Sequence, residues 1–321
     1  MDQAELEAAH CWEAEDRVPG RPAMTEFRRL LRLHQAQWRE AHGHPIGSQP
    51  IVPKPGKPAR LVGSRLPLDY ARERGANFIS AGALAAARAR TAHAEPRQSF
   101  DHQRLWADLL WSEALAFNLF GDVDADRFVA SRWPDAPGAV RELRFVHSPG
   151  WLDPAYLYSL RAFDAALVLD GGAIVGVDVK YHERAKPETP KPENMRRYLQ
   201  VAKRSGVFAR GALERVKGRS DLAVMWLEHL LLLSMLQHES GAWSWARYVV
   251  VHPAGNTDVA DLCARYRELL ADESTFASVT LEQVLDAGAH PRSAAAGLRE
   301  RYVPSAPVKM TATRSPEISS P

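Results

Sequence analysis

The residues with the clearest chemical potential lie in two apolar runs of the 321-residue sequence, which are joined by residues 170–172. The first run contains Asp164, and the second contains Asp178 and Lys180. A short glycine-containing loop between two such runs indicates a β-hairpin. Two carboxylates and a lysine in otherwise apolar strands make this hairpin the first candidate for a functional site.

The strand pattern predicts how these side chains lie. Asp178 and Lys180 share one face, because side chains alternate along a strand. If Leu169 pairs with Ala173 across the loop, Asp164 falls opposite Asp178, whereas a bulge would shift the register by one residue. Facing carboxylates repel each other. A divalent cation between them would remove this repulsion, because hard cations prefer carboxylate oxygens.

A glutamate upstream of the hairpin adds a third carboxylate. The spacing of apolar residues predicts one helix from Gln103 to Phe120. Glu113 lies on the apolar stripe of that helix. A carboxylate buried there must be paired, protonated or bound to a metal ion. The alternative is a glutamate at the edge of the stripe that bends towards solvent.

A basic segment follows the hairpin. Residues 184–220 contain eleven Lys or Arg and three Glu. Such a segment could contact the phosphates of a nucleic acid, since Lys and Arg supply most non-specific affinity for them. It could equally be a solvated face or a flexible loop. The net charge of +2 for the whole chain indicates no partner.

The composition is that of an ordinary globular protein, with 45% hydrophobic and 25% charged residues. The only cysteines, Cys11 and Cys263, form no disulfide framework and no zinc-binding spacing. The N-terminus lacks the pattern of a signal peptide. The most apolar run, residues 222–236, is too short to span a bilayer comfortably. We therefore expect a cytoplasmic protein without membrane contact.

Four other residues allow two interpretations or are assigned to the core. His182 shares the predicted face of Asp178 and Lys180, so it could touch a substrate or lie in solvent at the strand end. Glu228 and His229 interrupt the apolar helix predicted over residues 221–239; they either support the site or form the one polar face of that helix. Trp226 is interpreted as a core residue.

The predicted elements divide the chain into three parts. Residues 1–100 form a helical arm with a Pro-rich linker, residues 101–303 the main domain, and residues 304–321 a disordered tail. The main domain has the order helix, strand, strand, strand, helix, strand. Its hairpin strands are apolar on both faces, which indicates a sheet covered by helices on each side. We therefore expect a three-layer α/β domain of order αβββαβ.

This order, with an acid on the first helix, an acid on the second strand and Asp178-Val179-Lys180 on the third, resembles the PD-(D/E)xK nuclease superfamily. Three stretches, LLWSEALAFNLFG, FDAALVLD followed by GVDVKYHE, and WLEHLLL, are similar to a branch of restriction-endonuclease-like proteins. Phe163 stands where this superfamily often has a proline. The aspartate before the lysine is an accepted variant of the motif.

The resemblance implies a metal-dependent endonuclease that hydrolyses phosphodiester bonds in DNA, with double-stranded DNA as the expected partner. Glu113, Asp164 and Asp178 would be the metal ligands, and donors that are all oxygens suit Mg²⁺ or Mn²⁺. Lys180 would position the attacking water and stabilise charge on the phosphate. The resemblance also allows a homodimer that cuts both strands.

Two competing hypotheses stay open. The first is a protein of the same fold that binds nucleic acid but no longer cuts it. The second is a protein without nucleic acid, in which the N-terminal region mediates assembly and the acids form ion pairs with the basic segment. Metal-dependent cleavage would support the nuclease, and DNA binding without metal would support the protein that no longer cuts. Aspartates paired to arginines would support the protein without nucleic acid.

Overall fold

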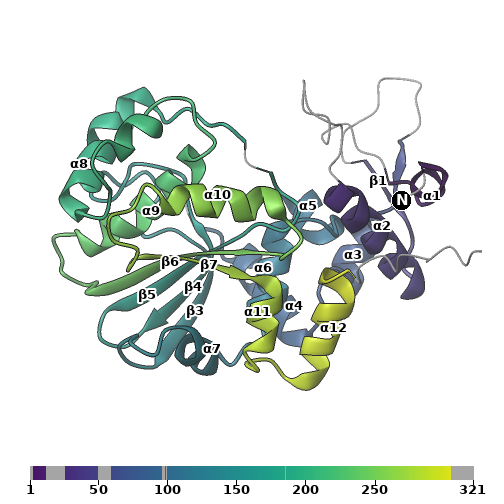
Figure 1. Ribbon diagram of the computed structural model, residues 1–321. Coiled ribbons are helices and arrows are strands. Elements are labelled where there is room, and N and C mark those ends of the chain that lie inside the picture. The colour runs from purple at the N-terminus through teal and green to yellow at the C-terminus, as the bar shows by residue number, and fades with distance from the viewer. Residues whose placement is uncertain are drawn as a thin grey trace, which may run out of the picture.

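The computed structural model describes residues 3–11, 26–49, 59–95, 98, 100–184 and 186–304 (Figure 1). Its centre is a five-stranded sheet in the order β3-β4-β5-β6-β7. The strands are β3 (Val140–His147), β4 (Phe163–Leu169), β5 (Ala173–Val179), β6 (Trp245–His252) and β7 (Phe276–Thr280), and a separate pair consists of β1 (Gly47–Ser48) and β2 (Leu61–Val62). Strands β3, β4 and β5 are antiparallel, whereas β6 and β7 run parallel to β5. The expected α/β class is confirmed.

Helices lie on both faces of this sheet (Figure 1). One face carries α8 (Met195–Ser205), α9 (Ala223–Leu236) and α10 (Thr257–Arg267). The other face carries α4 (Ala81–Ala92), α6 (Ser112–Phe120), α7 (Ala125–Arg132), α11 (Leu281–Asp286) and α12 (Arg292–Tyr302). The remaining helices are α1 (Gln3–Ala8), α2 (Glu26–Ala41), α3 (Leu68–Arg74) and α5 (His102–Ala107), with the 3₁₀ turns η2 (Pro192–Asn194) and η3 (Ala212–Arg215).

Strand β5 shows why both faces need cover. All of its residues are buried. Val175 and Val177 pack in the apolar cluster that includes α4 and α6, whereas Ile174 packs in the cluster that includes α8 and α9. A strand that is apolar on both sides is stable only when helices remove both faces from water.

The predicted hairpin is formed by β4 and β5. Gly171 and Gly172 have φ angles of 73° and 75°, in the left-handed region that glycine adopts without strain. A side chain at Gly172 would also place its Cβ 2.4 Å from the carbonyl oxygen of Ala242. The loop that joins the strands therefore depends on glycine for its conformation and for space.

The single helix predicted over residues 103–120 is wrong, because the chain forms α5 and α6 there instead. Asp108 lies between them in an extended conformation, with φ −96° and ψ 110°. Its side chain accepts a hydrogen bond of 3.0 Å from the Leu110 N–H and forms a 3.0 Å ion pair with Arg65. Aspartate competes in this way with helical backbone bonds, which apolar periodicity does not reveal.

Helices from the N-terminal hundred residues pack on the sheet domain. Leu31 of α2 and Ala83 of α4 belong to the apolar cluster that also contains α6. The Gln35 side chain donates hydrogen bonds to the Tyr181 hydroxyl at 3.0 Å and to the Arg301 carbonyl at 2.6 Å. Helix α2 therefore links the chain that leaves β5 to α12.

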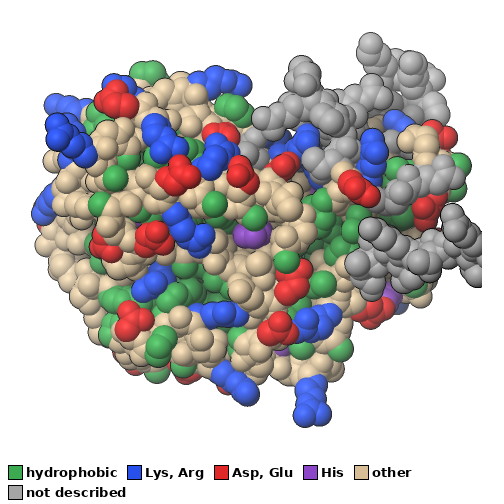
Figure 2. All heavy atoms as spheres, in the orientation of Figure 1, with side chains coloured by type: hydrophobic (Ala, Val, Ile, Leu, Met, Phe, Trp, Pro, Cys, Tyr) green, Lys and Arg blue, Asp and Glu red, His purple; other side chains and the backbone are tan. Residues whose placement is uncertain are grey.

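The basic segment 184–220 is partly helical, which its charge pattern did not predict. Helix α8 buries Tyr198, Val201 and Ala202 against the sheet domain. Its exposed side carries basic residues such as Lys203, and Figure 2 shows Lys and Arg side chains over the α8 end of the molecule. The segment therefore combines a packed face with a charged one.

The predicted C-terminal tail lies outside the described residues except for Pro304, and so do residues 12–25 of the N-terminal region and residues 50–58 of the Pro-rich linker. Among the helices that are described, none is long and apolar enough to cross a membrane.

Candidate active site

The hairpin brings Asp164 and Asp178 together at its open end. The observed register pairs Leu169 with Ala173 and continues to Ala165 with Val177, as predicted. Asp164 and Asp178 are the next residues on the two strands. The charge of Asp178 raises the pKa of Asp164, which places the two carboxylates within electrostatic reach of each other.

The Asp164 side chain, on β4, is held by the backbone of β5. Its Oδ2 accepts a hydrogen bond of 2.7 Å from the backbone N–H of Val179. Burial raises the pKa of Asp164 well above its ordinary value, and the charge of Asp178 raises it further, against the opposing effects of Lys180 and the Val179 N–H. Asp164 is therefore a carboxyl group that needs a positive charge nearby to ionise.

Asp178 is held from two sides. It is 7% exposed, and its Oδ1 lies 2.7 Å from the Lys180 Nζ. The Tyr248 hydroxyl, on β6, donates a hydrogen bond of 3.1 Å to Oδ2. Burial lowers the pKa of Lys180, but the charges of Asp178 and Asp164 outweigh it and raise the pKa overall. Lys180 is therefore an ammonium ion that neutralises Asp178.

Glu113 lies in the first turn of α6, directly after the break at Asp108. Its Oε1 is buried, and no group in the described ranges forms a hydrogen bond with it. Burial raises the pKa of Glu113 from 4.5 to about 7, and the charge of Asp101 adds to this, while Arg90 opposes it. Glu113 in turn raises the pKa of Asp164, so the two groups interact electrostatically.

The sequence did not reveal a second ion-pair network beside the site. Arg161 forms ion pairs with Glu228 at 2.6 Å and with Glu188. Burial raises the pKa of Glu228 against the opposing effect of Arg161, and Asp178 and Lys180 also act on it. Glu228 was noticed as an interruption of the apolar helix, and the structure favours the interpretation that it supports the site. No sequence signal identified Arg161 or Tyr248.

Arg184 was also missed as an individual residue. Its side chain is 6% exposed, and its Nε donates a hydrogen bond of 3.2 Å to Asp258. Its Nη1 is buried without a hydrogen-bond partner in the part of the chain that the structure describes. Arg184, Lys180 and Lys186 line one cavity of about 180 Å³. Glu183 and Asp221 line the same cavity, so its charge is mixed, and the three cations exceed the two carboxylates by one. The cations could bind an anionic oxygen, such as one of a phosphate.

The two histidines that allowed two interpretations both lie in packed surroundings. The charges that act on His182 are those of Glu183, Arg32, Asp108 and Arg28, and neither Asp178 nor Lys180 is among them, so the structure does not support the predicted shared face. His182 is not in solvent either: burial lowers its pKa, and the nearby charges include Arg32 and Asp108. His229 is fully buried, with hydrogen bonds to Tyr266 and Thr275, so it belongs to the core.

Trp226 is fully buried in the cluster between the sheet and α9. Its assignment to the core is confirmed.

The carboxylate oxygens of the site are donors of the type that a hard divalent cation prefers, but they are not arranged as a complete coordination site. Asp164 and Asp178 repel each other, and Glu113 has an orphaned oxygen; all three offer oxygen donors, which Mg²⁺ and Mn²⁺ prefer. Among the described residues, no group of three or more His, Cys, Asp or Glu side chains could hold a metal ion as it stands. The structure therefore brings Asp164, Asp178 and Lys180 together and leaves Glu113 at the edge of the site.

Comparison with known proteins agrees with this architecture. A model of the PD-(D/E)XK nuclease superfamily matches residues 22–304, which is most of the chain. Neither the search of curated proteins nor the search of solved structures gives a match. The chain belongs to the PD-(D/E)XK nuclease superfamily, as the sequence predicted. Members of this superfamily generally hydrolyse phosphodiester bonds and typically use divalent metal ions.

Proposed function

We propose that the protein is an endonuclease that hydrolyses phosphodiester bonds in double-stranded DNA with Mg²⁺ or Mn²⁺. One observation carries the proposal: Asp164 and Asp178 lie side by side at the open end of the hairpin, with the Lys180 ammonium 2.7 Å from Asp178. Membership of the nuclease superfamily supports the same reaction class.

The carboxylates are the proposed metal ligands. Asp164 and Asp178 would bind the cation directly, and Glu113 would complete the site from α6, directly or through water. When bound there, the cation lowers the pKa of a coordinated water and stabilises charge on the phosphate. The Tyr248 hydroxyl keeps Oδ2 of Asp178 in place through its 3.1 Å hydrogen bond. The Val179 N–H does the same for Asp164.

Lys180 is proposed to act as a positively charged donor. Its raised pKa keeps the proton on Nζ, so this atom can donate hydrogen bonds to the attacking water and to a phosphate oxygen. A donor that is already fixed beside Asp178 needs little reorganisation when negative charge develops on the phosphate. Lys180 would therefore stabilise the transition state rather than remove the proton from water.

Arg184 is proposed to bind the neighbouring phosphate of the same strand. Arg184 lines the same cavity as Lys180 and Lys186, and its buried Nη1 has no hydrogen-bond partner among the described residues. An arginine nitrogen buried without an acceptor is costly, and an anionic oxygen would satisfy it. The phosphate backbone would then run from the carboxylates towards α10.

The nuclease unit is proposed to extend over residues 101–303, with α6, β3, β4, β5, α9 and β6 as the αβββαβ core. Residues 1–100 would be an addition to this core, although α2 and α4 pack closely on it. A homodimer is the assembly we propose for cutting both strands, because each copy offers one site.

A protein that binds nucleic acid without cutting it is the second candidate. The ion pair between Lys180 and Asp178 favours it, because the lysine already neutralises a carboxylate that a cation would need. Such a protein would bind DNA in the absence of metal, with an affinity that falls steeply as salt rises.

A cleavage assay with the full chain tests the proposal. Supercoiled plasmid, linear duplex, single-stranded DNA and RNA are each incubated with Mg²⁺, with Mn²⁺ and with EDTA. We expect metal-dependent cleavage of duplex DNA that is abolished in Lys180→Met. Asp170→Asn is the control, because Asp170 is an exposed acid at the opposite end of the same hairpin. Binding without cleavage of any substrate would support the second candidate instead.

A further inference from the structure

A second cavity lies between α4 and β3, outside the group of carboxylates. Its volume is about 610 Å³, which is in the range of small-molecule sites. Helix α4 contributes Ala86 and Ala89 to its wall, and β3 contributes Leu143 and Phe145. These side chains form an apolar patch in a lining that otherwise consists mainly of polar and charged residues.

Two buried polar groups in this cavity lack a partner. His147 and Ser148 are 8% and 5% exposed. The Nε2 of His147 and the Oγ of Ser148 form no hydrogen bond to any residue that the structure describes, and both residues line the cavity. Each such group costs about 1–3 kcal/mol when it is buried without a partner. A ligand with both a donor and an acceptor would satisfy them.

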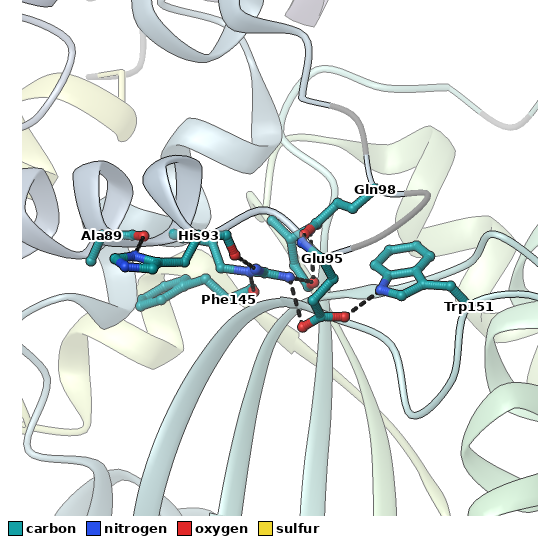
Figure 3. A network of polar contacts seen from close by, with 8 residues as sticks. Ala89, His93, Glu95, Gln98, Phe145 and Trp151 are labelled. Carbon is teal, nitrogen blue, oxygen red and sulfur yellow. Dashed lines mark hydrogen bonds and ion pairs between the residues drawn. The ribbon is translucent and has the colours of Figure 1, made fainter.

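The backbone next to these groups is strained. Val146 has a φ of 47°, which is rare for a β-branched residue and costly to maintain. Its carbonyl accepts hydrogen bonds from Arg90 at 3.1 Å and from Gln98 at 3.3 Å, and Arg90 also donates to the Phe145 carbonyl at 2.7 Å. Figure 3 shows this network at one end of β3. It holds the conformation that leads into His147 and Ser148.

The charges around the cavity are balanced. Arg90 pairs with Glu95 at 3.1 Å, and Arg144 pairs with Glu142 at 2.6 Å. Burial, together with the charge of Arg144, lowers the pKa of His147 to about 4, so the imidazole is neutral near pH 7. The lining therefore favours an uncharged ligand over a phosphate or a carboxylate.

The cavity opens at the same end of the sheet as the carboxylates. His147 pairs with Phe163, the residue directly before Asp164. On the helical side, the charge of Arg90, which lines the cavity, acts on Glu113. A nucleotide with its phosphate at Asp164 could therefore place its base beside β3.

We propose that the cavity between α4 and β3 binds one nucleobase, with His147 Nε2 and Ser148 Oγ as its hydrogen-bonding partners. A nucleobase is flat, uncharged and carries donors and acceptors on one edge, which matches the apolar patch of α4 and β3 and the two polar groups that have no partner among the described residues. The inference rests on the proposed function in one respect: it takes the base from a nucleotide of the bound DNA that has left the stack next to the cleaved bond. A free nucleoside offers the same chemistry.

A fluorescent base analogue tests the strand as the source. Oligonucleotides with 2-aminopurine at successive positions are bound by the Lys180→Met protein, which keeps them intact. We expect a several-fold rise in fluorescence at one position, because the base leaves the stack. Ala89→Trp should block the cavity from an exposed helix position and abolish the rise. Ala85→Trp is the control, because Ala85 is also exposed on α4 but does not line the cavity.

The polar partners are tested separately. In Ser148→Ala, the Kd obtained from the 2-aminopurine fluorescence should rise by about tenfold, as expected for the loss of one buried hydrogen bond. A response that survives unchanged in Ala89→Trp would overturn the proposal. Thermal unfolding of each variant shows whether it folds.

Titration of the wild-type protein with free adenosine, guanosine, cytidine and thymidine, monitored by NMR, tests the other source. Binding that Ala89→Trp removes, without any response from the oligonucleotides, would support a nucleobase site and overturn the strand as its source. If nucleosides bind but no nucleic acid is cleaved, the proposed function fails while the cavity assignment holds. If DNA is cleaved but neither probe responds, the cavity assignment alone fails.

Discussion

Two buried glutamates approach the same pair of aspartates from opposite faces of the sheet. Glu228, on α9, has an arginine partner at 2.6 Å. Glu113, on α6, has a buried oxygen that forms no hydrogen bond with any described residue. Burial raises both pKa values. Among the described residues Glu228 forms an ion pair with Arg161, whereas Arg90 opposes the rise for Glu113 without forming one. We call Glu228 the compensated glutamate, because it has an ion pair, and Glu113 the uncompensated glutamate, because it has none among the described residues.

This difference separates a structural role from a functional one. An ion pair such as Arg161–Glu228 fixes the position of its members and leaves little capacity for a ligand. An acid held without a partner is destabilising unless something binds to it. We therefore propose that Glu228 supports the site and that Glu113 binds a ligand.

The largest expected effect comes from the aspartate between the two faces. Asp178→Asn should lower the rate of DNA cleavage by about 10³-fold or more, because a metal ligand contributes several kcal/mol to transition-state stabilisation. Single-turnover cleavage of labelled duplex DNA measures the rate. Asp170→Asn should cleave at the wild-type rate; equal losses in both variants would show that the effect is not specific to the site.

The compensated glutamate should matter most for stability. Glu228→Gln should lower the free energy of unfolding by up to about 3 kcal/mol, because Arg161 keeps only Glu188 as a charged partner. Urea unfolding at pH 7 measures this difference. Arg265→Gln is a control, because it breaks more exposed pairs with Asp221 and Asp261 and should cost about 1 kcal/mol or less. A larger loss in the control would contradict the comparison.

The uncompensated glutamate should behave in the opposite way. Its raised pKa means that the folded state binds its proton more tightly, so folding stability falls as pH rises from 4.5 to about 7. Glu113→Gln should remove this loss. It should stabilise the protein by up to about 3 kcal/mol at pH 8 and have little effect at pH 4. Urea unfolding in EDTA at both pH values tests this, and equal effects at both would refute it.

A bound metal ion should supply the positive charge that the carboxylates on the Glu113 side lack, and so stabilise the folded protein. At 100 times its Kd, Mg²⁺ should stabilise the folded protein by about 2.7 kcal/mol, because it binds the folded state only. Scanning calorimetry measures this as a rise in Tm. Asp164→Asn should lose most of the rise, whereas Glu228→Gln should keep it. An equal rise in all three proteins would place the metal elsewhere.

The smallest expected effect concerns Arg184. Arg184→Met should weaken DNA binding and reduce the slope of log K against log salt by about one, as for the loss of one phosphate contact. Fluorescence anisotropy at several salt concentrations measures the slope. Lys203→Met, on the exposed side of α8, is the matched control. A larger change in the control would move the phosphate contact to α8.

The centre of the site could be predicted from the sequence because it is local. A glycine loop and the two-residue alternation of its strands are enough to place Leu169 opposite Ala173 and, from there, Asp164 next to Asp178. Glu113 stands out in the pattern as an acid on an apolar helix face, although the single helix predicted around it is wrong and its role in the site stays a prediction.

The rest of the site depends on contacts between distant segments. Tyr248 reaches Asp178 across 70 residues, and Arg161 reaches Glu228 across 67 residues. A neighbouring strand and a covering helix supply these partners, and their choice depends on tertiary packing. The solvent alternative for His182 is wrong for the same reason, because the chain after β5 is buried near residues from distant segments such as Arg32 and Asp108.

The contact between Gln35 and the carbonyl of Arg301 has a consequence for the order of folding. It spans 266 residues, so α2 leaves the ribosome long before its partner on α12 has been made. Gln35 also holds Tyr181, directly after Lys180. The two hydrogen bonds of Gln35 can therefore both form only after Arg301 has been synthesised. By then the strands of the sheet around the candidate site have already been translated.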